Sequence, residues 1–358
     1  MNILMYNIIN KNRFILFFKL AFLFIFCSLD SLLAQNLTDI DQGWPNWAYG
    51  YLENLQEGDT TAPNCPIDTK KAIDCAYRGN PADNTIKYGL PDTSLEFTAY
   101  ESAYDYGPAD WYPQDHPIMP DIVAYGRIDD GLRACSLCHY PNGQGKMENG
   151  HVAGLPYNFI VSQLQLFADG KRKSSDPRKA NTNEMSIIAR SLTDREIEEA
   201  AKYFSSIPFK PLVKVIESNT APQVRMSMNG LMLPLDKPFV QLDDYIIEVP
   251  EFPQRTAITR DPRVGFLTYV PIGSINKGEL LVLTGEGKTV PCSICHGLNL
   301  RGNGDIPGIV GKTASYTMRQ LWDIKLGTRH SPEMLPTVIN LNEQDLLAIS
   351  AYLASLSP

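Results

Sequence analysis

The sequence is poor in histidine and has no long run of basic residues. Its 358 residues include 5 histidines and 7 cysteines, and acidic side chains outnumber basic ones to give a net charge of −8. Phosphate backbones are bound through clustered Lys and Arg, so we expect no nucleic-acid partner. With so few residues that ligate metals or form covalent links, the positions of those that are present carry most of the information.

Four of the seven cysteines lie in two copies of one pentapeptide. Cys135, Cys138 and His139 form the first C-x-x-C-H motif, and Cys292, Cys295 and His296 form the second. This composition predicts the pattern roughly 0.002 times by chance. Two cysteines at this spacing reach the vinyl groups of one porphyrin as thioethers, and the adjacent histidine binds its iron. A zinc ribbon needs a second cysteine pair nearby, and the chain has none, so the motifs predict two covalently attached c-type haems.

The other cysteines depend on how the N-terminus is processed. Basic residues precede the apolar run at 20–26, and a small-residue site follows, which predicts an export signal over residues 1–34. The alternative is an uncleaved membrane tether, because residues 14–33 are almost long enough to span a bilayer. Cleavage removes Cys27 and leaves Cys65 and Cys75, which we expect to form a disulfide in an exported protein. The alternative is that one of these thiolates ligates a haem iron.

Changes in composition divide the mature chain into four segments. Residues 35–120 are an irregular extension rich in aromatic residues and proline, whose rings either cover a haem or fill a loop-rich core of their own. Residues 121–208 and 273–358 have helical patterning and each contains one haem motif. Residues 209–272 form a proline-rich connector with short strand candidates, among them 224–228 and 245–249. The predicted fold is mainly α: two helical haem domains, the connector with some β, and the loop-rich extension.

Local signals place several helices. Residues 157–168 carry apolar side chains on one face. Thr193 with Glu196, and Asn342 with Asp345, are capping pairs that start the last helix of each haem domain, and Ser274 is a candidate N-cap for a further helix.

The two haem segments are related by an internal repeat. A shift of 157 residues superposes the motifs and places Gln163 on Gln320 and Arg172 on Arg329; further along, the shift is 149 and places Met185 on Met334. Both methionines precede a helix N-cap by eight residues, and we expect both in loops as distal iron ligands, because a thioether raises the potential of an electron-transfer haem. The rival distal ligands are His151 and His330; His116 is expected in a loop.

This order of haem motif, Gly-rich loop, helix and methionine resembles the class I c-type cytochromes, here in a tandem dihaem form. The resemblance covers residues 121–208 and 274–358 and implies two small all-α haem domains, a periplasmic location and electron transfer. The extension and the connector depart from the pattern. An iron ligated on both faces leaves no substrate site, so we expect a carrier of single electrons rather than an enzyme.

Two alternatives remain open. The first alternative to a carrier is the cytochrome subunit of a dehydrogenase complex. The second is a dihaem peroxidase-like oxidoreductase, in which one face of a haem iron is open to substrate. The expected partners are redox proteins: a dehydrogenase, an oxidase or another cytochrome. A basic loop at 171–179 is either a docking surface for an acidic partner or simply solvated.

Overall fold

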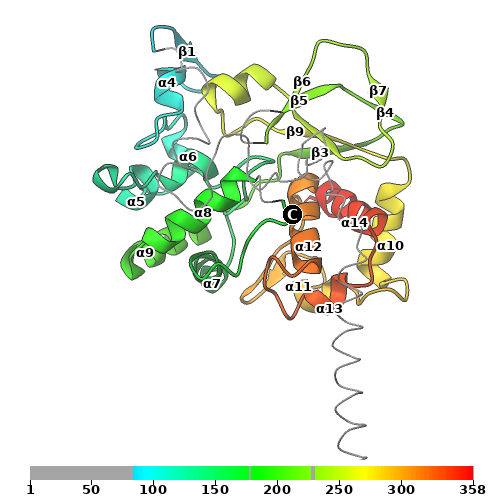
Figure 1. Cartoon of the computed structure of the whole chain (residues 1–358). Helices are drawn as coiled ribbons and strands as arrows, with labels where there is room; N and C mark the ends of the chain where they lie inside the picture. Colours follow the sequence, from blue (N-terminus) through cyan, green and yellow to red (C-terminus); the bar gives the residue numbers. More distant parts are fainter. Residues whose placement is uncertain (1–83, 177–178, 227–229, 358) are drawn as a thin grey trace, which may run out of the picture. The chain divides into compact units, whose positions relative to one another are not determined.

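Helices build the first repeat around its haem motif. The computed structural model describes residues 84–176, 179–226 and 230–357, all within one compact unit that spans residues 45–358 (Figure 1). The elements of the first repeat are α5 (Asp121–Ala124), η2 (Ile128–Asp130), α6 (Cys135–His139), α7 (Tyr157–Ala168), α8 (Ala180–Ser191) and α9 (Asp194–Ser206). The predicted capping box of Thr193 and Glu196 is confirmed at the start of α9. Buried side chains of α7, α8 and α9 form the core, among them Ile160, Ile188 and Phe204.

The second repeat follows the same plan, with the eleven-residue α10 before its motif where the first repeat has the four-residue α5. Its elements are α10 (Ser274–Thr284), α11 (Ser293–His296), β10 (Gly302–Asn303), β11 (Ile306–Pro307), α12 (Ala314–Lys325), α13 (Leu335–Val338) and α14 (Glu343–Ser355). Asn342 and Asp345 form the predicted capping box. The N-cap of α10 is Gly273, one residue before the expected Ser274. Gly278 lets α10 lie directly against α14, since a side chain there would overlap the carbonyl of Ala348.

The internal repeat is confirmed helix by helix. The bounds of α7 and α12 differ by 157 residues at both ends, and those of α9 and α14 differ by 149. The difference arises between these helices, where the first repeat has the twelve-residue α8 and the second has only the four-residue α13.

The two repeats contact each other reciprocally around Arg172 and Arg329, which pair as an antiparallel bridge. The Arg172 guanidinium donates to Gln163 of its own repeat (2.8 Å) and to Gln320 of the other (3.0 Å). The Arg329 guanidinium donates to Gln320 (2.8 Å) and to Gln163 (3.1 Å). Each repeat therefore gives the other the same contact that it receives.

The described part of the connector contains strands at both predicted places, β5 and β8. Its elements are β3 (Val213–Glu217), β4 (Thr220–Ala221), β5 (Val224–Met226), β6 (Met232–Pro234), β7 (Val240–Gln241), β8 (Ile247–Pro250), the π-helical turn η3 (Arg255–Thr259) and β9 (Phe266–Val270). Strand β9 is central, pairing in parallel with β3 and antiparallel with β8. The carboxylate of Glu248 in β8 binds the start of α12, accepting the amide of Ala314 at 2.9 Å.

The described part of the extension has a small core of its own, one of the two predicted arrangements. Its elements are β1 (Lys87–Gly89), β2 (Glu96–Thr98), α4 (Ala99–Ser102) and η1 (Pro113–Asp115). Trp111 and Tyr112 are buried with Leu90, and Phe97 meets the Trp111 ring edge-on at 4.8 Å. The signal segment, Cys65 and Cys75 lie outside the described residues. Within the described ranges, no helix combines the length and the apolar character that crossing a bilayer requires.

Candidate functional site

Each haem motif forms a single helical turn. In α6 the motif runs from Cys135 to His139, and in α11 Cys292 is the N-cap residue before Ser293–His296. None of the four motif cysteines forms a disulfide. Burial raises the pKa of Cys135 to about 12 and that of Cys292 to about 11, so both are neutral thiols in the chain without haem.

The two histidines are oriented by backbone carbonyls at matching positions. Nδ1 of His139 lies 2.8 Å from the carbonyl oxygen of Gly150, and Nδ1 of His296 lies 2.7 Å from that of Pro307. Each acceptor is eleven residues beyond its histidine. Donation from Nδ1 fixes the tautomer that leaves the Nε2 lone pair for iron. Burial also lowers the pKa of both imidazoles, which favours the neutral, ligating form. The eleven-residue step is the same in both repeats, but no residue type marks these carbonyls in the sequence.

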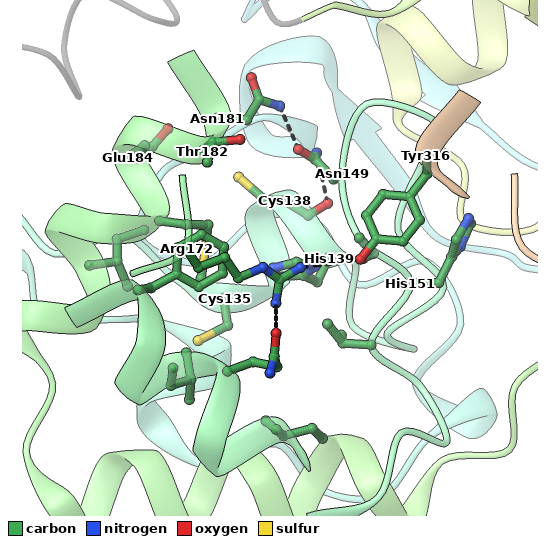
Figure 2. Close-up of a pocket in the computed structure, with 18 of the residues that line it drawn as sticks. Cys135, Cys138, His139, Asn149, His151, Arg172, Asn181, Thr182, Glu184 and Tyr316 are labelled. Atoms are coloured by element: carbon green, nitrogen blue, oxygen red, sulfur yellow. Dashed lines mark hydrogen bonds between the residues drawn. The ribbon is translucent and has the colours of Figure 1, made fainter. Parts of the chain in front are cut away.

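A cavity opens beside His139 (Figure 2). Figure 2 shows Cys135, Cys138, His139 and Arg172 among the residues that line it. Apolar side chains from the helices form much of its wall: Ile160, Leu164, Phe167, Ile188 and Phe204. A porphyrin has an apolar ring, vinyl groups that bond to the thiols, and carboxylates that favour a cation. The lining therefore fits a haem attached at α6.

Met185 lines the same cavity as His139. The expectation that it lies in a loop is wrong, because residues 180–191 form α8 and Met185 is in its middle. The run of apolar and helix-favouring residues after it continues the helix, and no glycine or proline interrupts it. Arg133 and Glu184, joined at 2.8 Å, lie on the same wall.

Met334 lies in a turn, as expected, and is the N-cap residue of α13. The hydroxyl of Thr337 is 4.0 Å from its sulfur. The hydroxyl of Thr289 donates to the Thr337 carbonyl at 2.6 Å. The segment that carries Met334 is thus held against the residues that lead into the second haem motif.

The rival histidines make other contacts. Nδ1 of His151 bonds to the Gln144 carbonyl, and Nε2 lies 3.3 Å from the amide nitrogen of Thr313, which donates to it. Burial, followed by the charge of Lys312, lowers the pKa of His151 to about 3, so it is a neutral buried link between the repeats. His330 has an exposed side chain, and its backbone amide donates to Lys171. His116 pairs with Asp110 at 3.1 Å.

The described cations of the segment at 171–179 have different surroundings. Lys171 and Lys173 are exposed, whereas Arg172 spans the contact between the repeats. Lys179 is buried and lines the cavity, and burial lowers its pKa to about 7. Two of the cations in this segment therefore have a structural place, and docking through the exposed pair stays a prediction.

Two attachment turns with oriented imidazoles, each followed by a helix and a methionine segment, define a c-type cytochrome that binds two haems. No family model matches the sequence. A cytochrome c4 from Stutzerimonas stutzeri is 35% identical over 159 residues, which cover 44% of this chain and 70% of that protein. The chain therefore belongs to the cytochrome c4 family of dihaem class I c-type cytochromes, and it carries two covalently bound haem c groups.

Other similar proteins align with different parts of this chain and of their own length. A protein named thiosulfate dehydrogenase electron acceptor, from Thiomonas intermedia, is 25% identical over 236 residues, which cover 63% of this chain and 80% of that protein. The chain spans only 36% and 57% of two further cytochromes c4, from Pseudomonas aeruginosa and Azotobacter vinelandii. The crystal structure of reduced cytochrome c4 from Pseudomonas stutzeri aligns with a TM-score of 0.39 and 23% identity, over 62% of this chain and 93% of that one.

Proposed function

We propose that this chain is an exported carrier that passes single electrons between redox proteins through two haems, each ligated by histidine and methionine. The proposed axial pairs are His139 with Met185 and His296 with Met334. The observation that carries the proposal is that Met185 and His139 line one cavity, while the rival His151 has both ring nitrogens in other bonds. The reciprocal position of Met334 extends the proposal to the second haem.

The residues of the chain act by holding each site closed and unchanged between redox states. Haem supplies an iron that cycles between the ferric and ferrous states. Gly150 and Pro307 fix the imidazoles by their carbonyls, and the partly buried thioethers of Met185 and Met334 would be the second ligands of the two haems. A ligand set that does not rearrange keeps the reorganisation small when an electron arrives.

The contact between the repeats supports transfer in series. The lining of the first cavity includes Tyr316, Arg319 and Gln320, which belong to α12 of the second repeat. Arg172 joins the cavity wall to Gln320. The first haem pocket therefore reaches the second repeat, and an electron has a short protein path between the two sites.

Near-infrared magnetic circular dichroism of the oxidised protein tests the ligand sets, since it separates methionine, histidine and lysine ligands of low-spin haem. We expect methionine signals from both haems, with M185A and M334A each removing one of them. M318L is the control, because Met318 is buried in the same helix bundle and has no counterpart in the other repeat. Signals from two histidines, an open iron face, or turnover of hydrogen peroxide would contradict the proposal.

Export is a second part of the proposal and has its own test. The predicted signal implies a mature protein in the periplasm of a Gram-negative-type bacterium that begins just after Ala34. Intact-mass analysis of the holoprotein should give a chain from residue 35 with two haems and two fewer hydrogens for a Cys65–Cys75 disulfide. A mass that retains residues 1–34 would instead indicate a membrane tether.

A second candidate function is that of electron acceptor for a dehydrogenase. It is favoured by the match to the Thiomonas intermedia protein, which spans most of that protein and carries that role in its name. Mixing the oxidised chain with thiosulfate and a purified thiosulfate dehydrogenase would reduce both haems if the role is shared. Haems that remain ferric under those conditions, but are reduced by small chemical reductants, would favour the general carrier.

A further inference from the structure

A buried ion pair joins the segment before the first haem motif to the helix that carries Met185. This pre-motif segment is residues 132–134, and its equivalent in the second repeat is residues 289–291. The guanidinium of Arg133 donates to the carboxylate of Glu184, the residue directly before Met185, at 2.8 Å. Both side chains of the pair are only 3% exposed. A charge-assisted bond of this length, shielded from water, holds the two segments at a fixed separation.

The N-terminal extension binds the same pre-motif segment. The carboxylate of Asp105 pairs with Arg133 at 3.2 Å, and its backbone carbonyl accepts the amide of Ala134 at 3.0 Å. Arg133 therefore connects three parts of the chain: the extension, the first haem motif and α8. Because two carboxylates bind different nitrogens of one planar guanidinium, its orientation toward Glu184 is fixed.

The second repeat does not keep this ion pair. The shift of 157 residues places Val290 at the position of Arg133. The shift of 149 places Glu333, which is exposed, at the position of Glu184. A valine side chain has no hydrogen-bond donor, so a link between the second pre-motif segment and Met334 has to use other groups.

The second repeat joins the same two segments through threonines. The hydroxyl of Thr289, the residue before Val290, donates to the carbonyl of Thr337 at 2.6 Å. The hydroxyl of Thr337 donates in turn to the carbonyl of Met334 at 2.7 Å. Each repeat thus bonds its pre-motif segment to its methionine segment, but with unrelated side chains. The link itself, rather than a particular residue type, is what the two sites share.

Such a link matters more for the methionine than for the histidine of each site. Each histidine directly follows an attachment cysteine in one helical turn, so covalent attachment of the haem keeps it near the iron. Each methionine comes from a separate segment, and its soft, uncharged sulfur binds a hard ferric ion weakly. Outer groups that orient a metal ligand typically change the affinity of the site 10–100-fold.

We propose that Arg133 and Thr289 are positioning residues, each of which holds a methionine segment against the turn that carries its haem and so keeps the thioether on ferric iron. This inference rests on the proposed carrier function and names the residues that keep its two sites closed. Opening a site is an exchange of ligands, in which an external base replaces the thioether. The iron keeps its oxidation state, and no proton is transferred.

Titration of the oxidised holoprotein with imidazole tests the proposal, because imidazole competes with the thioether for ferric iron. Proton NMR follows the shifted methyl signals of the iron-bound methionines, which M185A and M334A assign to the first and the second haem. R133Q should lower the half-saturating imidazole concentration of the first haem about 10–100-fold. The value for the second haem should stay within about twofold of that in the unmodified protein.

A second variant of the pair and a matched control accompany R133Q. E184Q keeps the shape of the side chain and leaves Arg133 paired with Asp105, and it should lower the same concentration at least about threefold. R255Q is the control, because Arg255 is the partner of the buried Asp261 in the connector and contacts neither methionine segment. Its two haems should bind imidazole as those of the unmodified protein do.

T289V should act on the second haem alone. The bond that it removes is neutral and therefore weaker, so the expected fall in the half-saturating concentration is about 2–10-fold. T284V is the control, because the hydroxyl of Thr284 donates to the Leu280 carbonyl of its own helix at 2.7 Å. It should leave both haems unchanged.

Circular dichroism establishes that each variant is folded, and E184Q decides the first test if R133Q is not. The proposal is overturned if R133Q and E184Q bind imidazole no more tightly than the unmodified protein, if R255Q opens the first haem as far as R133Q does, or if T289V leaves the second haem unchanged. Failure of the carrier function looks different, because the methionine methyl signals would then be missing from the unmodified protein itself.

Discussion

Variants of Glu248 test whether the connector is a structural part of the haem domains or only a tether between them. Its buried carboxylate accepts bonds from Thr268 (2.6 Å), Ala314 (2.9 Å) and Ser315 (2.5 Å). The last two residues begin α12, so this one side chain joins the connector sheet to the second repeat. E248A removes the acceptor from three buried donors. A buried donor left without its acceptor costs about 1–3 kcal/mol, and partial rearrangement of the hydroxyls leaves an expected loss of about 3–5 kcal/mol.

The isosteric variant E248Q separates shape from charge. Burial raises the pKa of Glu248, against the opposing bonds from Ser315 and Thr268. The folded chain therefore holds the proton more tightly than the unfolded chain does, and this contribution to stability is full below about pH 4 and declines as pH rises through the folded-state pKa. Glutamine does not titrate. The free energy of unfolding of the unmodified protein should thus fall relative to that of E248Q as pH rises above about 4.

Urea unfolding followed by far-ultraviolet circular dichroism at several pH values measures both effects. E251A is the control, because Glu251 lies at the end of the same sheet and pairs with an exposed Lys214 at 2.6 Å. That pair should contribute no more than about 1 kcal/mol. A cost of E248A within about 1 kcal/mol of the E251A value would refute the reasoning, because the start of α12 would then have found other partners.

Three further predictions concern contacts between segments. D115N weakens the two-bond pair with Arg263 and should cost about 1 kcal/mol at neutral pH in thermal melts. Because Arg263 lowers the pKa of Asp115, the unmodified protein should lose this stabilisation as pH falls through the folded-state pKa. D115N should not show that part of the acid dependence. The same loss of stability at acid pH in both proteins would contradict this. G278A should destabilise by about 2–4 kcal/mol in urea, since the new Cβ would overlap the carbonyl of Ala348 and lie 2.7 Å from Cβ of Tyr352, whereas G89A, with nothing within 4 Å, should cost far less. Similar costs for the two would show that α10 can move away from α14. In a double-mutant cycle of R172Q and R329Q, the shared glutamine acceptors predict a coupling of about 0.5–3 kcal/mol, and strict additivity would show that the reciprocal contact carries no energy.

What the sequence could predict is what depends on neighbouring residues. The capping pairs at Thr193 and Asn342 located two helices because cap and partner are three residues apart. The haem motifs and the repeat followed from spacing alone. The position of Met185 by the first cavity followed from the repeat, although its helix did not, because α8 has no counterpart to compare with and no cap signal at its start.

The remainder depends on partners that are distant in sequence. Nothing near Arg172 or Lys179 shows that they point inward, because the groups that surround them come from other elements. Asp105 pairs with Arg133 just before α6, and Arg260 donates to the Leu137 carbonyl in α6, but nothing near either residue in the sequence indicates these contacts. The eleven-residue step from histidine to carbonyl was present in the sequence, but a backbone acceptor has no residue type by which to recognise it.

The pairing of Arg172 with Arg329 places two residues that are equivalent in the internal repeat opposite each other. The bonds of their guanidinium groups to the two glutamines have the same symmetry, so this part of the contact is isologous, as in a homodimer with a twofold axis. A substitution at either arginine therefore removes one half of a matched pair of contacts. The attachment helices do not keep this symmetry, since Leu137 in α6 is 1% exposed and its equivalent Ile294 in α11 is 67% exposed.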